Sequence, residues 1–176
     1  MEFEQLLKER RSVRAYKKET VPHELLTKIL KEAQQAPSWA NMQTSRTYVV
    51  ESPEFLEDFR KKALPEGNAL RSANAVLLVT TFVRDTVAYR DGEPMTDLGN
   101  KWGAYDLGLR DAYLILAAKN AGLDTLIMGI RYPEAIRECL KIPENEDIVS
   151  VIAVGYRDEE PQDRKRKDFE EVVRFF

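Results

Sequence analysis

The chain has 176 residues, 43% of them hydrophobic, which suffices for one domain with a buried core and excludes a disordered chain. Its net charge of −3, from 27 Lys and Arg against 30 Asp and Glu, argues against a general nucleic-acid coat. A single cysteine excludes an internal disulfide and favours a reducing, cytoplasmic compartment. A single histidine gives no case for a structural zinc site. The apolar runs are far shorter than the roughly 20 residues needed to cross a bilayer.

The first half of the chain contains helical patterns and one strand. Leucines repeat at helical spacing after Glu2 and again after Pro22, a residue suited to a first helical position, and Pro37 stops the second run. The acidic opening, with Glu2 and Glu4, is also unlike a secretory signal. We expect helices at Glu2–Glu9, from Pro22 to before Pro37 and at Pro53–Leu64, a strand at Thr47–Val50, and a loop at Pro65–Asn68.

The second half alternates strands and helices around one long helix. Residues from Trp102 to Asn120 are apolar on most sides, which is typical of a central helix, and Gly122 is placed to end it. Its two carboxylates, Asp106 and Asp111, are interpreted as surface charge of that helix. We expect strands at Ala75–Val83, Leu123–Met128 and Asp147–Tyr156, a helix at Pro133–Lys141, and a long mobile loop, functional or disordered, at residues 84–100.

These elements predict a single layered domain over residues 1–176, of the α+β or α/β class. No Gly-x-Gly-x-x-Gly follows a predicted strand and no P-loop pattern is present. Both absences argue against a nucleotide site built on backbone amides, so a phosphate would have to be held by side chains. Cys139 fits a helical apolar pattern and needs no role beyond that of a small buried hydrophobe.

The last segment, about residues 157–176, is predicted to be an arm. It is charged from Arg157 onward, yet it ends in Phe175 and Phe176. An apolar end of this kind needs a surface to cover. That surface is either the core of the same chain or a second subunit, as in an exchanged-arm dimer.

The densest cluster of chemistry-bearing side chains lies between the first two helices, at Arg10, Arg11, Ser12 and Arg14. Arginine offers a rigid fork of donors that matches planar, anionic oxygen groups. The cluster is therefore a candidate binding site for a phosphate or an electron-rich heterocycle. The alternative is a solvated basic turn without a ligand. An RNA-binding module built on this cluster and on residues 164–167 is a further alternative, which the acidic net charge disfavours.

Four segments carry a family resemblance. Arg10–Tyr16 reads Arg-Arg-Ser-x-Arg-x-aromatic, and Ala36–Gln43 reads Ala-Pro-Ser-x-x-Asn-x-Gln. A helix end and strand follow over Ala117–Ile130, and Leu140–Tyr156 precedes the basic run 164–167. In this order they resemble the nitroreductase family of FMN-dependent oxidoreductases over nearly the whole chain.

The resemblance implies an α+β fold, with a mixed sheet flanked by helices, in an intertwined homodimer. It implies FMN as cofactor, NAD(P)H as hydride donor, and a nitroaromatic, quinone or similar electrophilic acceptor in a ping-pong reaction. Because the flavin performs the chemistry, no catalytic side chain and no metal is expected. The sequence leaves the choice between NADH and NADPH open, since no ribose-reading acidic residue follows a dinucleotide motif.

The same resemblance assigns residues to the two ends of FMN. At the phosphate end it implies Arg10, helped by Arg164 or Arg166, with Ser12 on phosphate or ribityl oxygens. Arg14 is implied at the pyrimidine edge of the ring, where a cation stabilises the negative charge of the reduced flavin. The other implied contacts are Arg11, Asn68 and Arg71, Gly129 and Ile130 with their backbone N–H groups, and Pro37, Ser38 and Asn41 from the partner subunit.

The chain departs from the family pattern after Gln43. Thr44 and Ser45 stand where the family usually continues with Pro and Trp, so an aromatic that would line the substrate side is missing. This departure leaves the substrate range open. It also motivates an alternative function, that of a non-turnover FMN-binding carrier or sensor.

Overall fold

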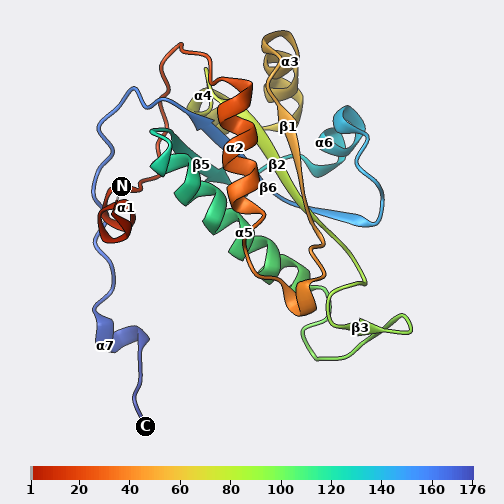
Figure 1. The fold of residues 1–176 in the computed structure, drawn as a ribbon. Helices are drawn as coiled ribbons and strands as arrows, with labels where there is room; N and C mark the ends of the chain where they lie inside the picture. The colour runs from red at the N-terminus through yellow and green to blue at the C-terminus, as the bar shows by residue number, and fades with distance from the viewer. Residues whose placement is uncertain (1) are drawn as a thin grey trace.

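The computed structural model describes residues 2–176. Figure 1 shows a central sheet covered by helices, with both ends of the chain on the same side of the molecule. The helices are α1 (Phe3–Glu9), α2 (His23–Ala33), the 3-10 turn η1 (Trp39–Asn41), α3 (Pro53–Ala63), α4 (Glu66–Arg71), α5 (Lys101–Asn120), α6 (Pro133–Leu140) and α7 (Phe169–Val172). The strands are β1 (Ser45–Val50), β2 (Val76–Val83), β3 (Tyr89–Arg90), β4 (Glu93–Pro94), β5 (Asp124–Met128) and β6 (Glu146–Gly155).

The main sheet has the strand order β1-β2-β6-β5, and its three strand pairs are antiparallel. Val79 of β2 pairs with Tyr48 on one side and with Val151 on the other, so β2 is central and buried as its uninterrupted apolar run predicted. The parallel component of the sheet is an isolated bridge between Ser12 and Thr125 beside β5. The α+β prediction is confirmed.

Helices cover both faces of the sheet because successive side chains of β2 point to opposite faces. Leu78 lies in one cluster with Leu26 of α2 and Leu114 of α5. Leu77 lies in the other cluster with Phe59 of α3. Figure 1 shows the matching layers, with α2 and α5 across one face of the sheet and α3 and α6 beyond the other.

Two loop predictions were wrong in part. The segment predicted as a loop at Pro65–Asn68 begins helix α4, because the Pro65 carbonyl accepts the N–H groups of both Asn68 and Ala69 at 2.9 Å. Residues 84–100 contain the short β3–β4 hairpin, and Val87 and Ala88 within them are buried. Burial of these two small apolar side chains ties the segment to the body of the molecule.

The prediction of surface charge on the long helix was also wrong. The side chains of Asp106 and Asp111 belong to residues only 4% and 7% exposed. The residues that α5 does expose include the aromatic Tyr105 and Tyr113. Asp111 faces the sheet, where the Thr80 hydroxyl donates to it at 3.2 Å, and Asp106 accepts the Trp39 N–H of the loop before β1.

The N-terminal segment and the start of the arm lie side by side. Lys17 N–H donates to the Tyr156 carbonyl at 2.8 Å, and Asp158 N–H donates to the Ala15 carbonyl at 2.9 Å. Beyond this point the arm leaves the body of the molecule, as Figure 1 shows. Its terminal Phe176 is fully exposed, so in one chain the arm end does not pack back on its own core. None of the helices described within residues 2–176 is long and apolar enough to cross a membrane.

Candidate flavin site

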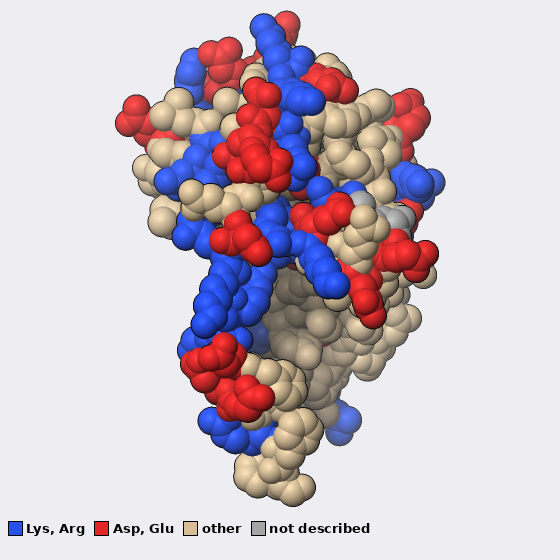
Figure 2. All heavy atoms as spheres, turned by 90° about the vertical axis from the view of Figure 1, so that its left-hand side faces the viewer, with Lys and Arg blue, Asp and Glu red and all other residues tan. Residues whose placement is uncertain are grey.

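Basic side chains meet in a cavity of about 370 Å³ between the N-terminal segment and the arm. Figure 2 shows blue side chains gathered where the arm leaves the body, beside a hollow. The predicted residues that the structure brings together here are Arg10, Arg11, Ser12, Arg14, Arg164 and Arg166, and the cavity is completed by residues 159–163.

Backbone hydrogen bonds position the first half of this cavity. Val13 is fully buried and its N–H donates to the Thr125 carbonyl at 3.0 Å, while the Tyr16 hydroxyl donates to the Val13 carbonyl at 2.9 Å. Since neighbouring side chains of an extended segment point to opposite sides, burial of Val13 turns Ser12 and Arg14 outward. One apolar residue therefore sets the direction of the polar residues on either side of it.

Five arginines and three carboxylates line the cavity, so positive charge is in excess. Burial lowers the pKa of Arg10, and the like charges of Arg166 and Arg11 lower it further. Arg11 is neutralised by Asp163 at 2.8 Å. Across residues 2–176 no carboxylate forms an ion pair with Arg10 or Arg166. Two guanidiniums that repel each other and form no ion pair of their own fit a phosphate, because a dianion removes their mutual repulsion.

A second group of predicted residues lies in the loop before β1. Ala40 and Asn41 have positive φ angles of 45° and 56°, and the Gln43 N–H donates to the Ser38 hydroxyl oxygen at 3.0 Å. Pro37 and Ser38 line a separate cavity of about 410 Å³. This tight loop holds its polar groups at the molecular surface through backbone geometry that non-glycine residues rarely adopt.

The third group joins α4 to the end of β5. The Asn68 side-chain amide donates to the Ile130 carbonyl at 2.8 Å. Arg71, one helical turn later, is exposed, and so is Ile130. A Cβ built on Gly129 would meet no atom within 4 Å, so the space in front of this backbone is open. These residues form a platform that a flat ligand can approach closely.

The predicted residues therefore lie in three places on one chain. The cavity of the arginines and the cavity of Pro37 and Ser38 share no lining residue. The expectation that Pro37, Ser38 and Asn41 serve the cofactor of a second subunit stays a prediction. Among residues 2–176 no group of three or more His, Cys, Asp or Glu side chains is arranged to hold a metal ion.

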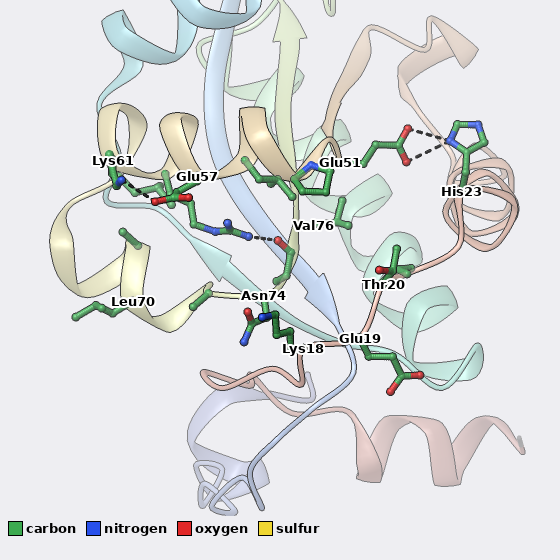
Figure 3. A pocket seen from close by; sticks show the side chains of 18 of the residues that line it. Lys18, Glu19, Thr20, His23, Glu51, Glu57, Lys61, Leu70, Asn74 and Val76 are labelled. Atoms are coloured by element: carbon green, nitrogen blue, oxygen red, sulfur yellow. Dashed lines mark hydrogen bonds and ion pairs between the residues drawn. The ribbon is translucent and has the colours of Figure 1, made fainter.

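A cavity of about 1240 Å³ between the start of α2, α3 and α4 was not predicted from the sequence. Figure 3 shows its charged rim, where Lys61 pairs with Glu57 at 2.8 Å and His23 with Glu51 at 2.9 Å. Its apolar lining comes from helix faces whose spacing is indistinguishable from that of a closed core.

Known proteins resemble this chain over most of its length. Residues 7–156 match the sequence model of the Nitroreductase family. The chain belongs to the nitroreductase family. A "Putative NADH dehydrogenase/NAD(P)H nitroreductase" of Archaeoglobus fulgidus is 32% identical, with 93% of this chain and 86% of that protein covered. An "NADH dehydrogenase" of Thermus thermophilus is 29% identical, with coverages of 93% and 91%.

A solved nitroreductase supports the same assignment in three dimensions. The structure described as "FMN-dependent Nitroreductase" from Clostridium difficile R20291 has a TM-score of 0.73 and 29% identity. The comparison covers 97% of this chain and 96% of that one. The predicted nitroreductase fold is thus confirmed.

Sequence reasoning missed three polar residues beside the second group. Asp106 accepts the Trp39 N–H at 2.9 Å, and Arg46 and Arg110 line the cavity of about 410 Å³ with it. Asp106 and Arg110 are four residues apart, a spacing that places both on one face of a helix. That spacing was the available signal in this nitroreductase sequence, but a pair of helix charges is usually only solvated.

Proposed function

We propose that this chain is an FMN-dependent oxidoreductase that moves a hydride from NAD(P)H to a nitroaromatic, quinone or similar electrophilic acceptor by a ping-pong mechanism. The observation that carries the proposal is the convergence of Arg10 and Arg166 in one cavity with Ser12. Family membership and the FMN dependence stated for the Clostridium difficile relative support it. When bound, the flavin supplies the hydride transfer in both half-reactions.

The arginine cavity would hold the phosphate end. Arg10, Arg164 and Arg166 supply charge, and the Ser12 hydroxyl supplies a short donor to phosphate or ribityl oxygens. The backbone N–H of Arg14 donates to Glu159 at 2.5 Å, which fixes this residue while its guanidinium stays at the cavity. In that position Arg14 favours negative charge on the pyrimidine edge of the ring.

The platform of Asn68, Arg71, Gly129 and Ile130 would contact the ring. The hydrogen bond from Asn68 to the Ile130 carbonyl fixes the loop after β5 against α4. Open space at Gly129 lets backbone N–H groups approach the reactive nitrogen of the ring. These residues orient the ring, and no side chain has to act as nucleophile or general base.

A second copy of the chain would complete the site. Pro37, Ser38 and Asn41 lie apart from the arginine cavity of their own chain, so they are available to the partner's cofactor. The exposed aromatic rings of Tyr105 and Tyr113 on α5, and the exposed Phe175 and Phe176 of the arm over residues 157–176, supply apolar surface for an intertwined homodimer.

The absorbance spectrum of the purified protein tests the proposal. We expect flavin bands in the purified protein, or bands that stay with the protein when FMN is added and unbound flavin is removed by gel filtration, and anaerobic bleaching by NADH or NADPH. A protein that retains no flavin after this step would overturn the proposal. Bound FMN that neither nicotinamide bleaches would leave the carrier or sensor as the function.

A further inference from the structure

The cavity of about 410 Å³ exists where this sequence departs from its family. Ser45, which stands where the family pattern has Trp, is one of its lining residues, together with Pro37 and Ser38. A tryptophan side chain buries 150 Å² or more, so its absence leaves room beside the loop. The small Ser45 side chain thus borders the cavity without filling it.

Two guanidiniums line this cavity. Arg46 donates to the Gln43 carbonyl at 2.9 Å, and Arg110 donates to the Thr47 hydroxyl. Throughout residues 2–176 neither guanidinium is in an ion pair with a carboxylate. Neither guanidinium is thus held in direct contact with a carboxylate, and five N–H donors per guanidinium exceed the acceptors that they contact.

Charges of both signs surround Arg110. Burial lowers the pKa of Arg110, the neighbouring Asp111 carboxylate opposes this, and the like charge of Arg46 lowers it again. The one carboxylate that lines the cavity, Asp106, uses Oδ2 to accept the Trp39 N–H, and burial raises its pKa. The Asp106 carboxylate therefore binds the loop backbone and forms no ion pair with Arg46 or Arg110.

We propose that this cavity binds an anionic oxygen group, a carboxylate or a phosphate, carried by a small-molecule reactant of the flavin. The inference rests on the proposed function, because Pro37 and Ser38 line the cavity and are proposed to face the cofactor. A guanidinium binds such groups through two parallel hydrogen bonds, which fixes the orientation of the reactant as well as its charge. The anion belongs either to the acceptor or to the pyrophosphate of the nicotinamide donor.

Substitution of Arg46 tests the inference with the FMN-loaded protein. To test whether the anion belongs to the acceptor, we compare para-nitrobenzoate with neutral nitrobenzene. To test whether it belongs to the donor, we compare NADH with the phosphate-free N-benzyl-dihydronicotinamide. Arg46→Gln should lower kcat/KM for the anionic member of one pair roughly ten-fold, the usual effect of losing a hydrogen bond to a charged group, and leave the neutral member unchanged. Arg90→Gln, in the exposed β3–β4 hairpin, is the matched control.

A calorimetric titration of the FMN-loaded protein with para-nitrobenzoate and with inorganic pyrophosphate gives a readout that needs no turnover, and bound FMN keeps the added anions out of the arginine cavity. Arg46→Gln and Ser45→Trp, which refills the cavity, should each weaken binding of the preferred anion roughly ten-fold. Equal effects on charged and neutral compounds, or no anion binding by the parent protein, would overturn the inference. Protein that binds anions but not FMN would contradict only the proposed function, and normal flavin reduction without charge preference would contradict only this inference.

Discussion

The main-chain N–H of Trp39 donates to Oδ2 of Asp106 at 2.9 Å, joining the loop before β1 to α5 across 67 positions of sequence. The indole rings of Trp39 and Trp102 pack 4.9 Å apart next to this bond. Ala40 and Asn41 follow in the left-handed region of φ. A buried carboxylate and an aromatic pair therefore hold a loop whose backbone is otherwise unfavourable.

Replacing Asp106 by Ala should loosen this loop. We expect the free energy of unfolding to fall by about 1–3 kcal/mol, because the buried Trp39 N–H loses its acceptor. FMN affinity should fall as well, since Ser38 and Asn41 lose their fixed positions. Asp106→Asn keeps an acceptor oxygen and is the control. Urea denaturation and FMN titration measure both effects, and equal losses in the two variants would refute the capping role.

The buried carboxyl of Asp111 should make stability depend on pH. Burial raises its pKa to about 6, against the hydrogen bond from Thr80 and the charge of Arg110. A carboxyl whose pKa is higher in the folded than in the unfolded state contributes stability below the unfolded value, and that contribution is lost as pH rises through the folded pKa. Asp111→Asn should therefore gain about 2–3 kcal/mol over the parent protein between pH 4 and pH 8.

Urea denaturation of both proteins at the two pH values measures this gain, and the difference between them cancels the other titrating groups. A gap in unfolding free energy that stays constant with pH would show that Asp111 is charged throughout the range.

Replacing Arg166 should weaken FMN binding but not lower the stability of the fold. Its like charge lowers the pKa of Arg10, so Arg166→Gln relieves repulsion in the FMN-free protein while it removes a phosphate ligand. We expect the Kd for FMN to rise roughly ten-fold or more, with an unchanged or higher Tm without FMN. Lys141→Gln, at an exposed residue after α6, should change neither value. A lower Tm without any effect on FMN binding would count against the assignment.

Lys119 and Asp124 form a buried ion pair at the junction of α5 and β5. Their charged atoms lie 3.1 Å apart, with side chains 10% and 4% exposed. Lys119→Met should cost about 3–5 kcal/mol because it leaves a buried carboxylate unpaired, and Lys119→Met with Asp124→Leu should cost much less. Chemical denaturation of the single and double variants measures these losses of unfolding free energy and the coupling between the two residues. A double variant as unstable as the sum of both single variants would show no coupling.

The two terminal phenylalanines of the arm are expected to stabilise the association of two chains. Replacing Phe175 and Phe176 by Ser removes two exposed rings from the arm, so the proposed dimer should dissociate at higher protein concentration than that of the parent protein. Light scattering over a dilution series follows this shift. Phe55→Ser, at a partly exposed position on α3, serves as the comparison. An unaltered mass at every dilution would argue against an exchanged arm.

The positions of the main helices and strands follow from local pattern. The apolar run of β2 and the leucine spacing of α2 predicted both elements to within a few residues, because side-chain period and burial are properties of short segments. The same reasoning missed α4, where Pro65 and Gly67 suggested a loop. A short helix of this kind depends on what it packs against rather than on propensity.

The sequence by itself determined the fold class, the family and the presence of an arginine-rich cluster. Tertiary structure decided which charges meet: it brought Arg166 to Arg10, buried Asp106 and Asp111, and left Arg46 and Arg110 outside the ion pairs of residues 2–176. These outcomes depend on contacts between segments far apart in the chain. Periodicity records which faces of an element are apolar, but electrostatic interaction depends on distances between charges that only the folded chain sets.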